Sequence, residues 1–227
     1  MSKRISKSVL DPIVGPRLSA LYTHLPIPRW FPPEGIVAIG HGFAILGAVG
    51  LAVSTTYWWG GLVASVGVVG NHFADCIDGR HARTTGQCRN GGELLDHFTD
   101  PLSFTYWMVG LAVACGRLDL GLVAVIVLMA MAVLTNLRAK LTGEFTLASF
   151  GPTEFKALLV GLGALMAAVM ATIGAAMATG VSLVALSALC GLGLFLLPIQ
   201  LIQSIREVNR CGSEPDTSEW ETTRAAS

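Results

Sequence analysis

Long apolar runs separated by short polar segments dominate this chain. Runs long enough to cross about 30 Å of hydrocarbon, at about 1.5 Å per helical residue, recur along it. Six such runs cover residues 36–55, 58–74, 93–115, 118–137, 154–177 and 181–205. The pattern therefore predicts an all-α integral membrane protein with six transmembrane helices.

The first 34 residues have a different pattern. Apolar residues recur there mostly every three or four positions, at Ile5, Val9, Leu10, Ile13, Val14, Leu18 and Leu21. This spacing predicts an N-terminal amphipathic helix at the membrane interface, kinked or shortened by Pro12 and Pro16. The chain then divides into an interfacial segment (1–34), a six-helix transmembrane domain (35–206) and a polar tail (207–227) that we expect to be disordered.

Composition supports a membrane protein, and the distribution of charge predicts its orientation in the membrane. Hydrophobic residues make up 52% of the chain and charged residues 13%, as in membrane proteins. The formal net charge is zero, so we expect no nucleic-acid partner. All 15 Lys and Arg residues except Arg117 fall on one side of a six-span arrangement. The positive-inside rule then places both termini, and the segment between the second and third runs, in the cytoplasm.

Four aspartates interrupt the apolar pattern where the second and third runs face each other across a loop. Asp75 and Asp78 are three residues apart and Asp96 and Asp100 four apart, so each pair lies on one helix face. If the runs form a hairpin around a loop over residues 79–91, the four carboxylates converge. Clustered carboxylates repel unless cations are bound, and their hard oxygens suit a pair of Mg²⁺ or Mn²⁺ ions.

Small and basic residues accompany the aspartates. Gly79 follows Asp78 directly and Gly92 opens the third run, so a bulky ligand can approach the backbone closely. Arg83 carries a planar, permanently charged fork that suits a phosphate or pyrophosphate. The sequence therefore predicts a phosphorylated ligand beside the metal ions.

Two other interpretations remain open. A zinc site would use His72, Cys76, His81, Cys88 and His97, because His72 and Cys76 share a helix face, but the aspartates favour a harder ion. A cation-coupled transporter also places acidic residues in the membrane. Transporter acids tend to lie near the bilayer midplane, whereas these aspartates lie at the ends of the runs.

The residues around the aspartates resemble the signature of the CDP-alcohol phosphotransferase (CDP-alcohol phosphatidyltransferase) family. The matching positions are Asp75, Asp78, Gly79, Ala82, Arg83, Gly92, Asp96 and Asp100. The resemblance implies a membrane enzyme of phospholipid synthesis that transfers a phospho-alcohol group, in the first place a phosphatidyl group, from a CDP-linked donor to an alcohol hydroxyl. It also implies release of CMP, dependence on Mg²⁺ or Mn²⁺, and a homodimer.

By position, the resemblance gives each motif residue an expected role. Four residues would hold two metal ions, and one of them, Asp100, would also be the general base on the acceptor hydroxyl; the four are Asp75, Asp78, Asp96 and Asp100. The CDP donor would contact five residues, Asp78, Gly79, Ala82, Arg83 and Gly92, the last leaving room for the nucleotide.

The substrates are less narrowly defined. Residues 92–97 and 151–154 are similar to those of choline and ethanolamine phosphotransferases, which join CDP-choline or CDP-ethanolamine to diacylglycerol. The chain is shorter than those eukaryotic enzymes, which favours a prokaryotic inner-membrane protein that uses CDP-diacylglycerol and a polar acceptor. Arg138 and Lys140 are candidates for binding an acceptor phosphate, although snorkelling at a span end explains them equally well.

One stretch departs from the family pattern. Many family members begin the first span with Pro-Asn-x-Ile-Thr, whereas this chain has Pro33-Glu34-Gly35-Ile36-Val37. The change removes two polar side chains and adds a negative charge at Glu34. We therefore expect the affinity for the donor, or the type of donor, to differ from that of other members.

Overall fold

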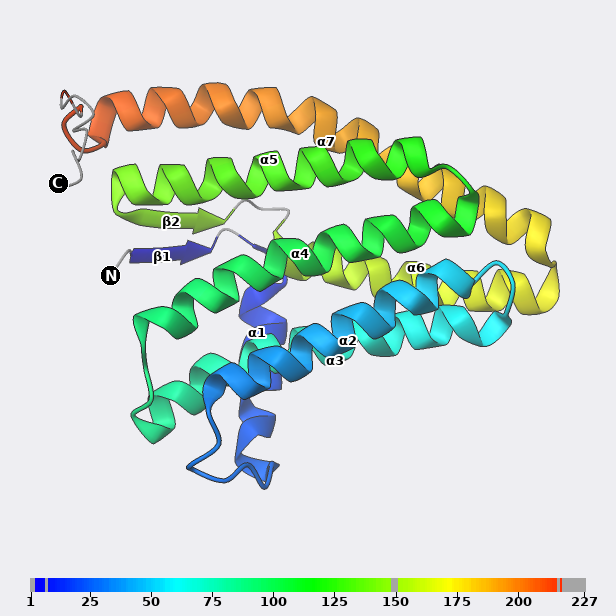
Figure 1. Ribbon diagram of the computed structural model, residues 1–227, viewed down its shortest axis with the longest axis horizontal. Helices are drawn as coiled ribbons and strands as arrows, with labels where there is room; N and C mark the ends of the chain where they lie inside the picture. The colour runs from blue at the N-terminus through cyan, green and yellow to red at the C-terminus, as the bar shows by residue number, and fades with distance from the viewer. Residues whose placement is uncertain (1–2, 7, 148–150, 216, 218–227) are drawn as a thin grey trace, which may run out of the picture.

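The structure is a computed structural model that describes residues 3–6, 8–147, 151–215 and 217. Long helices lying side by side form its body, and a shorter helix, α1, crosses them (Figure 1). The helices are α1 (Asp11–Leu21), α2 (Pro33–Val53), α3 (Trp58–Thr85), α4 (Asn90–Cys115), α5 (Leu118–Thr142), α6 (Pro152–Thr172) and α7 (Ala175–Cys211). A 3-10 turn, η1 (Tyr22–His24), follows α1.

Two short strands, β1 (Lys3–Ser6) and β2 (Glu144–Leu147), pair in parallel, with Lys3 opposite Glu144. Neither strand was predicted from the sequence, because four residues carry no clear alternating pattern and the pairing joins distant parts of the chain. Next to them, Glu154 at the start of α6 accepts hydrogen bonds from the Ser8 hydroxyl (2.6 Å) and the Leu10 amide (3.0 Å). The N-terminal segment is thereby fixed to α6.

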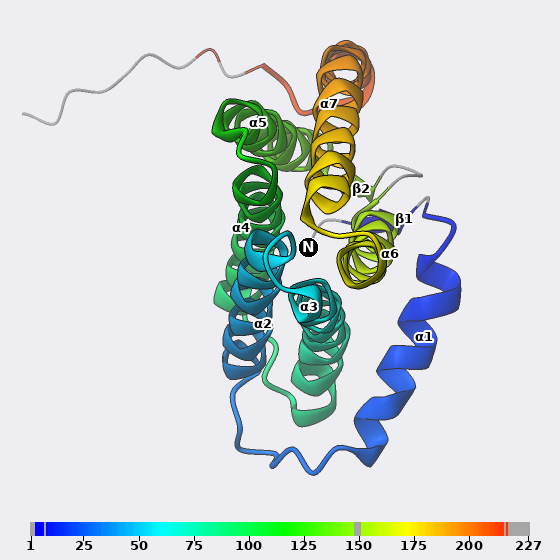
Figure 2. The same ribbon diagram turned by 90° about the vertical axis from the view of Figure 1, so that its right-hand side faces the viewer.

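The connections between helices alternate between the two ends of the bundle (Figure 1). The α3–α4 connection lies at the same end as the strands and the end of α7, and the α2–α3, α4–α5 and α6–α7 connections lie at the other. Figure 2 views the helices end-on and shows α1 at the side of the bundle, away from α4, α5 and α7. In the bundle, α3 packs between α2 and α6, and α4 contacts α2, α5 and α7.

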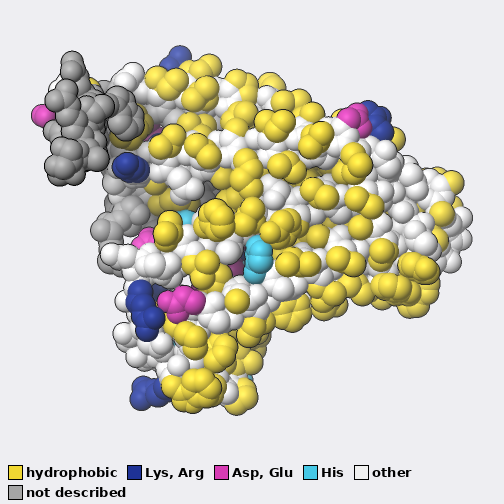
Figure 3. All heavy atoms as spheres, viewed as in Figure 1, with side chains coloured by type: hydrophobic (Ala, Val, Ile, Leu, Met, Phe, Trp, Pro, Cys, Tyr) yellow, Lys and Arg dark blue, Asp and Glu magenta, His cyan; other side chains and the backbone are white. Residues whose placement is uncertain are grey.

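Among the described residues, four helices are long and apolar enough to cross a membrane: α2, α5, α6 and α7. On the face shown in Figure 3, hydrophobic side chains are spread over the helices, and most of the charged side chains gather at the end that carries the strands, with one acidic and basic group at the other end. The all-helical, membrane-protein character is therefore confirmed. Six spans remain a prediction, because α3 and α4 are not apolar enough to be counted as membrane spans. Both helices contain glycine, His and Asp residues.

The core forms where small residues let the helices approach. A Cβ atom on Gly67 of α3 would lie against the Gly47 backbone of α2 and 2.7 Å from the Phe43 carbonyl oxygen. The buried Trp107 of α4 fills the adjoining space and donates from Nε1 to the Ala44 carbonyl at 3.0 Å. These contacts fix α3 and α4 against α2, and hence fix the faces that carry the aspartates.

Several helix boundaries differ from the sequence expectation, and at two of them a glycine turns the backbone. The loop predicted over residues 79–91 is wrong, because α3 continues to Thr85 and ends at Gly86, which adopts a φ of 74°. The fifth run was expected to reach residue 177, but α6 ends at Thr172 and α7 begins at Ala175, after Gly174 with a φ of 110°. Both errors arise because apolar periodicity does not show where a glycine turns the backbone.

The terminal segments also differ from expectation. A helix does form near the N-terminus, but over Asp11–Leu21 only, and its apolar residues are spread around it rather than gathered on one face. The expected amphipathic helix is therefore not confirmed. At the other end, α7 extends to Cys211, beyond the predicted start of the tail at residue 207. Residues 216 and 218–227 of that tail lie outside the described residues.

Candidate active site

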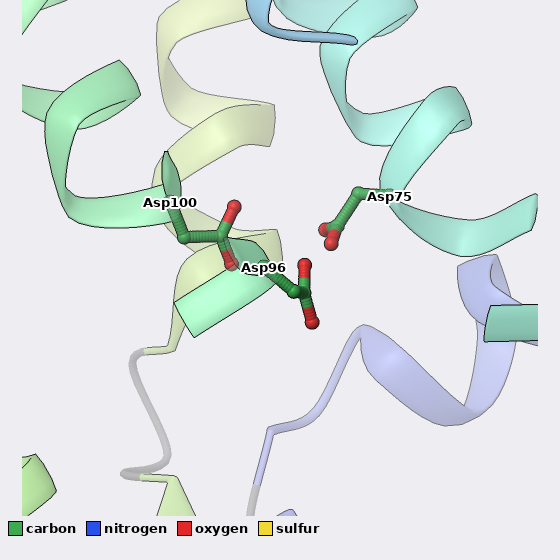
Figure 4. Close-up of side chains that lie close together, drawn as sticks. All are labelled: Asp75, Asp96 and Asp100. Atoms are coloured by element: carbon green, nitrogen blue, oxygen red, sulfur yellow. The ribbon is translucent and has the colours of Figure 1, made fainter. Parts of the chain in front are cut away.

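Three aspartates from α3 and α4 point toward one another (Figure 4). One carboxylate oxygen from each of Asp75, Asp96 and Asp100 lies within 4.8 Å of the others. Asp75 comes from α3, and Asp96 and Asp100 lie one turn apart on α4. The helical spacing seen in the sequence thus brings three of the four predicted carboxylates to one point.

This group fits a hard divalent cation. Oxygen atoms bound to one Mg²⁺ at about 2.1 Å are at most about 4.2 Å apart, so small side-chain rotations would bring the three carboxylates onto a shared ion. Each carboxylate has two oxygens, which also allows two ions about 3.5–4 Å apart to share ligands. Asp75, Asp96 and Asp100 are therefore the residues that would hold such ions.

Asp78 is close to this group without belonging to it. Its side chain is 8% exposed, and one carboxylate oxygen accepts a hydrogen bond from the Gly79 backbone N–H. Asp78 lines the same cavity as Asp75 and Asp96. A change of rotamer would be needed before Asp78 could bind an ion together with the other three.

The cavity beside the aspartates has a volume of about 640 Å³, within the range of pockets that hold a nucleotide-sized ligand. It extends from the aspartates along α3 toward the α3–α4 connection. All five predicted donor-binding residues line it: Asp78, Gly79, Ala82, Arg83 and Gly92. A hollow of only about 10 Å³ shares Asp75, Asp78 and Asp96 with the cavity and also reaches Asp100.

Arg83 lies along this cavity one turn beyond Gly79. A Cβ atom on Gly79 would be 3.2 Å from Arg83 Nη1, so the missing side chain leaves room for the guanidinium. The Arg83 side chain is exposed to the cavity, as a group that binds an incoming phosphate must be. The structure therefore places a cationic fork and metal-ligating carboxylates in one continuous cavity.

Glu34 and Val37 of α2 also line this cavity, so the departure from the family pattern lies at the expected donor site. Glu34 Oε1 is 3.7 Å from Arg89 Nη1, and Oε2 is buried without a hydrogen-bond partner. A Cβ atom on Gly92 would be 3.8 Å from Glu34 Oε1. Glu34 thus faces the place where Gly92 was expected to leave room for the nucleotide.

Lys156 of α6 completes the aspartate site and was not predicted from the sequence. Its ammonium donates to Asp75 Oδ2 at 2.9 Å and lies 3.6 Å from Asp100 Oδ1. In the sequence, Lys156 counts only as one of the 14 basic residues assigned to one side of the membrane. Its only signal there was its position within an apolar run, two residues after Glu154.

The other candidates lie apart from this group. Among the described residues, the three aspartates are the one group of three or more ligating side chains this close together, so the zinc set is not assembled. Both His81 ring nitrogens are already used, by the Tyr22 hydroxyl and the Phe31 carbonyl, each at 2.8 Å. Arg138 donates to the Thr146 carbonyl, and its Nη1 is 3.7 Å from Glu207. Neither Arg138 nor Lys140 lines either hollow, so their acceptor role stays a prediction.

Comparison with known proteins defines the family. Residues 36–197 match the family model described as CDP-alcohol phosphatidyltransferase. The chain belongs to the CDP-alcohol phosphatidyltransferase family. Membership confirms the resemblance drawn from the aspartate motif. The family is generally dependent on divalent metals, which agrees with the chemistry of the three clustered carboxylates.

The individual relatives match only part of this chain. Cholinephosphotransferase 1 from Homo sapiens is 32% identical over 94 residues, which is 39% of this chain and 23% of the human protein. The Bos taurus protein gives the same figures, and the Danio rerio protein is 30% identical over 96 residues, 40% of this chain and 25% of its own. The match spans about a quarter of the curated relatives' length. These relatives are animal proteins and give no support to the expected prokaryotic setting.

Proposed function

We propose that this protein transfers a phospho-alcohol group from a CDP-linked donor to an alcohol hydroxyl, with release of CMP, as a step of phospholipid synthesis. One observation carries the proposal: the carboxylates of Asp75, Asp96 and Asp100 converge beside a cavity lined by the remaining family-motif residues. This arrangement joins an oxygen-rich metal site to a pocket of nucleotide size.

The residues divide the work as follows. Asp75, Asp78, Asp96 and Asp100 would hold two divalent ions, whose charge would neutralise the pyrophosphate and the departing CMP. Arg83 binds a donor phosphate. Gly79 and Gly92 have no side chains, so the nucleotide can lie close to the main chain that lines the cavity. Asp100 accepts the proton of the attacking hydroxyl, which bonds to the donor phosphorus as the phosphoanhydride bond to CMP breaks.

Two donors deserve testing. The family description and the first interpretation of the sequence favour CDP-diacylglycerol with a polar acceptor. The likeness to cholinephosphotransferases, over 94 residues, favours CDP-choline or CDP-ethanolamine with diacylglycerol. Both reactions release CMP, so a single product can be measured for either donor.

The test is CMP release by purified protein in mixed micelles, with Mg²⁺ or Mn²⁺ and each donor against a panel of alcohols. We expect CMP with one donor and acceptor pair, no CMP in EDTA, and a loss of at least about 10³-fold in Asp100→Asn. Asp119→Asn is the matched control, because Asp119 pairs with Arg117 at the other end of the bundle. CMP release in EDTA at the full rate, or an active Asp100→Asn protein, would contradict the proposal.

We further propose that all six long helices cross the membrane, with the strands, the α3–α4 connection and the end of α7 on the cytoplasmic side. Two facts support this: the connections alternate between the ends of the bundle, and all Lys and Arg except Arg117 belong to the segments assigned to one side. The expected homodimer and the prokaryotic inner membrane remain predictions.

A further inference from the structure

Lys156 is among the most completely buried large side chains in the described part of the chain, at 1% exposed. Its ammonium lies between carboxylates from two other helices, 2.9 Å from Asp75 Oδ2 on α3 and 3.6 Å from Asp100 Oδ1 on α4. One lysine on α6 thus joins the three helices around the aspartate site. Buried lysines are rare and need opposite charges nearby, which these two carboxylates supply.

The same arrangement neutralises part of the repulsion among the aspartates. Asp75, Asp96 and Asp100 have carboxylate oxygens within 4.8 Å of one another, and Asp78 is close by. Without a cation, such a group would push α3 and α4 apart. A fixed ammonium in contact with two of the carboxylates offsets that repulsion. His72 Nδ1 is 3.8 Å from the same Asp75 oxygen but carries a full positive charge only when protonated.

A divalent ion and Lys156 would compete for the same carboxylates. The ion needs oxygens of Asp75 and Asp100, and a dication a few ångströms from an ammonium is strongly repelled at the low effective dielectric of a buried site. Phe104 of α4 gives the ammonium a second place to interact, since Lys156 Nζ is already 5.7 Å from the centre of its ring. An aromatic face attracts a cation at this distance.

We propose that Lys156 is an internal counter-cation of the aspartate site, which holds Asp75 and Asp100 together when no divalent ion is bound and weakens the binding of that ion. The proposal rests on the proposed function only in expecting a divalent ion at these aspartates. Lys156 is thus a positioning residue that sets the metal affinity of the site.

The test compares Lys156→Met with Lys156→Arg in purified protein without donor or acceptor. Methionine keeps an unbranched side chain of similar length and removes the charge, whereas arginine keeps the charge. Mn²⁺ affinity is measured by titration, and the melting temperature is measured in EDTA and at saturating Mn²⁺. We expect Lys156→Met to bind Mn²⁺ about tenfold or more tightly than the natural protein, and Lys156→Arg to bind it with similar affinity.

The melting temperatures separate this role from ordinary packing. In EDTA, Lys156→Met should melt below the natural protein, because the carboxylates then repel without a counter-charge, and saturating Mn²⁺ should restore most of the loss. A lysine that only fills space would give a loss that Mn²⁺ does not restore, and unchanged Mn²⁺ affinity. Unchanged Mn²⁺ affinity in Lys156→Met overturns the proposal. Weaker Mn²⁺ binding also overturns it, because it would mean that Lys156 orients the metal ligands instead.

A second measurement uses the natural protein and does not depend on how the variants fold. In an experimental structure with Mn²⁺ bound, we expect Lys156 Nζ more than about 4 Å from Asp75 Oδ2, beyond ion-pair distance. An ammonium that keeps its contact with Asp75 while the ion is bound overturns the proposal. Mn²⁺ binding is measured without substrates, so the two proposals are tested independently. A protein that releases no CMP can still show the expected Mn²⁺ affinities, and tight Mn²⁺ binding is not evidence for the proposed reaction.

Discussion

Arg83 and Arg80 lie one turn apart on α3 and have different surroundings. Arg83 lines the 640 Å³ cavity, whereas Arg80 donates from Nη1 to the Ser19 hydroxyl at 3.0 Å and lies over the Tyr22 ring. At the residue scale, therefore, one arginine is available to a ligand and the other fixes the N-terminal segment against α3. Two substitutions of the same kind separate these roles.

Arg83→Ala should weaken donor binding by about 2 kcal/mol, roughly thirtyfold, because it removes charge-assisted hydrogen bonds to phosphate. Its melting temperature should change by no more than about 2 °C, since an exposed side chain contributes little to packing. Equilibrium binding of the CDP donor measures the first quantity. Arg80→Ala is the control and should retain donor affinity. Equal donor affinity in Arg83→Ala and the natural protein would remove Arg83 from the donor site.

Glu34 and Val37 test whether the departure from the family pattern matters. Both side chains line the cavity, and Glu34 adds a negative charge to the proposed donor site. The double change Glu34→Asn with Val37→Thr should lower the KM for the donor several-fold, about 1 kcal/mol, because it removes the repulsion and adds hydrogen-bonding groups. Steady-state CMP release over a range of donor concentrations measures this shift. A KM that does not move would show that the donor binds away from Glu34.

At the scale of elements, close approach of α2 and α3 sets the geometry of the site. Gly67→Ala places a methyl group against the Gly47 backbone, so we expect a loss of about 2 kcal/mol from overpacking and a fall of several degrees in melting temperature. Gly161→Ala on α6 is the control, because a Cβ atom there meets nothing within 4 Å. Thermal melts in detergent compare the two. Equal melting temperatures would contradict the packing described for α2 and α3.

Helical periodicity predicted which residues share a helix face but not where the helices end. Spacing of three and four residues placed each pair of aspartates on one face correctly, because this depends only on the pitch of a helix. The extent of α3 to Thr85 and the turn at Gly174 were not predicted. Those boundaries depend on where a glycine adopts a positive φ, and the hydrophobic pattern does not report it.

For the whole molecule, the main prediction is the arrangement across the membrane. Cys88, in the α3–α4 connection, and Cys211, at the end of α7, are exposed free thiols at one end of the bundle. Two variants each keep one of these cysteines and have the other four replaced by Ala. A membrane-impermeant maleimide should label each variant from the cytoplasmic side. A cysteine-free chain with Leu118→Cys, at the opposite end, should be labelled only from the other side. Labelling of Cys88 and Cys211 from opposite sides would contradict six spans.

The sequence by itself determined the membrane character, the helical class, the family motif and the facing of its aspartates, because each follows from composition or from spacing within one segment. Tertiary structure decided which groups complete the site. Lys156 reaches Asp75 across 81 positions of sequence, and β1 pairs with β2 over a still longer separation, with Lys3 opposite Glu144. The contact between Lys156 and Asp75 arises only when α6 packs against α3, and that packing depends on how small residues on distant helices fit together.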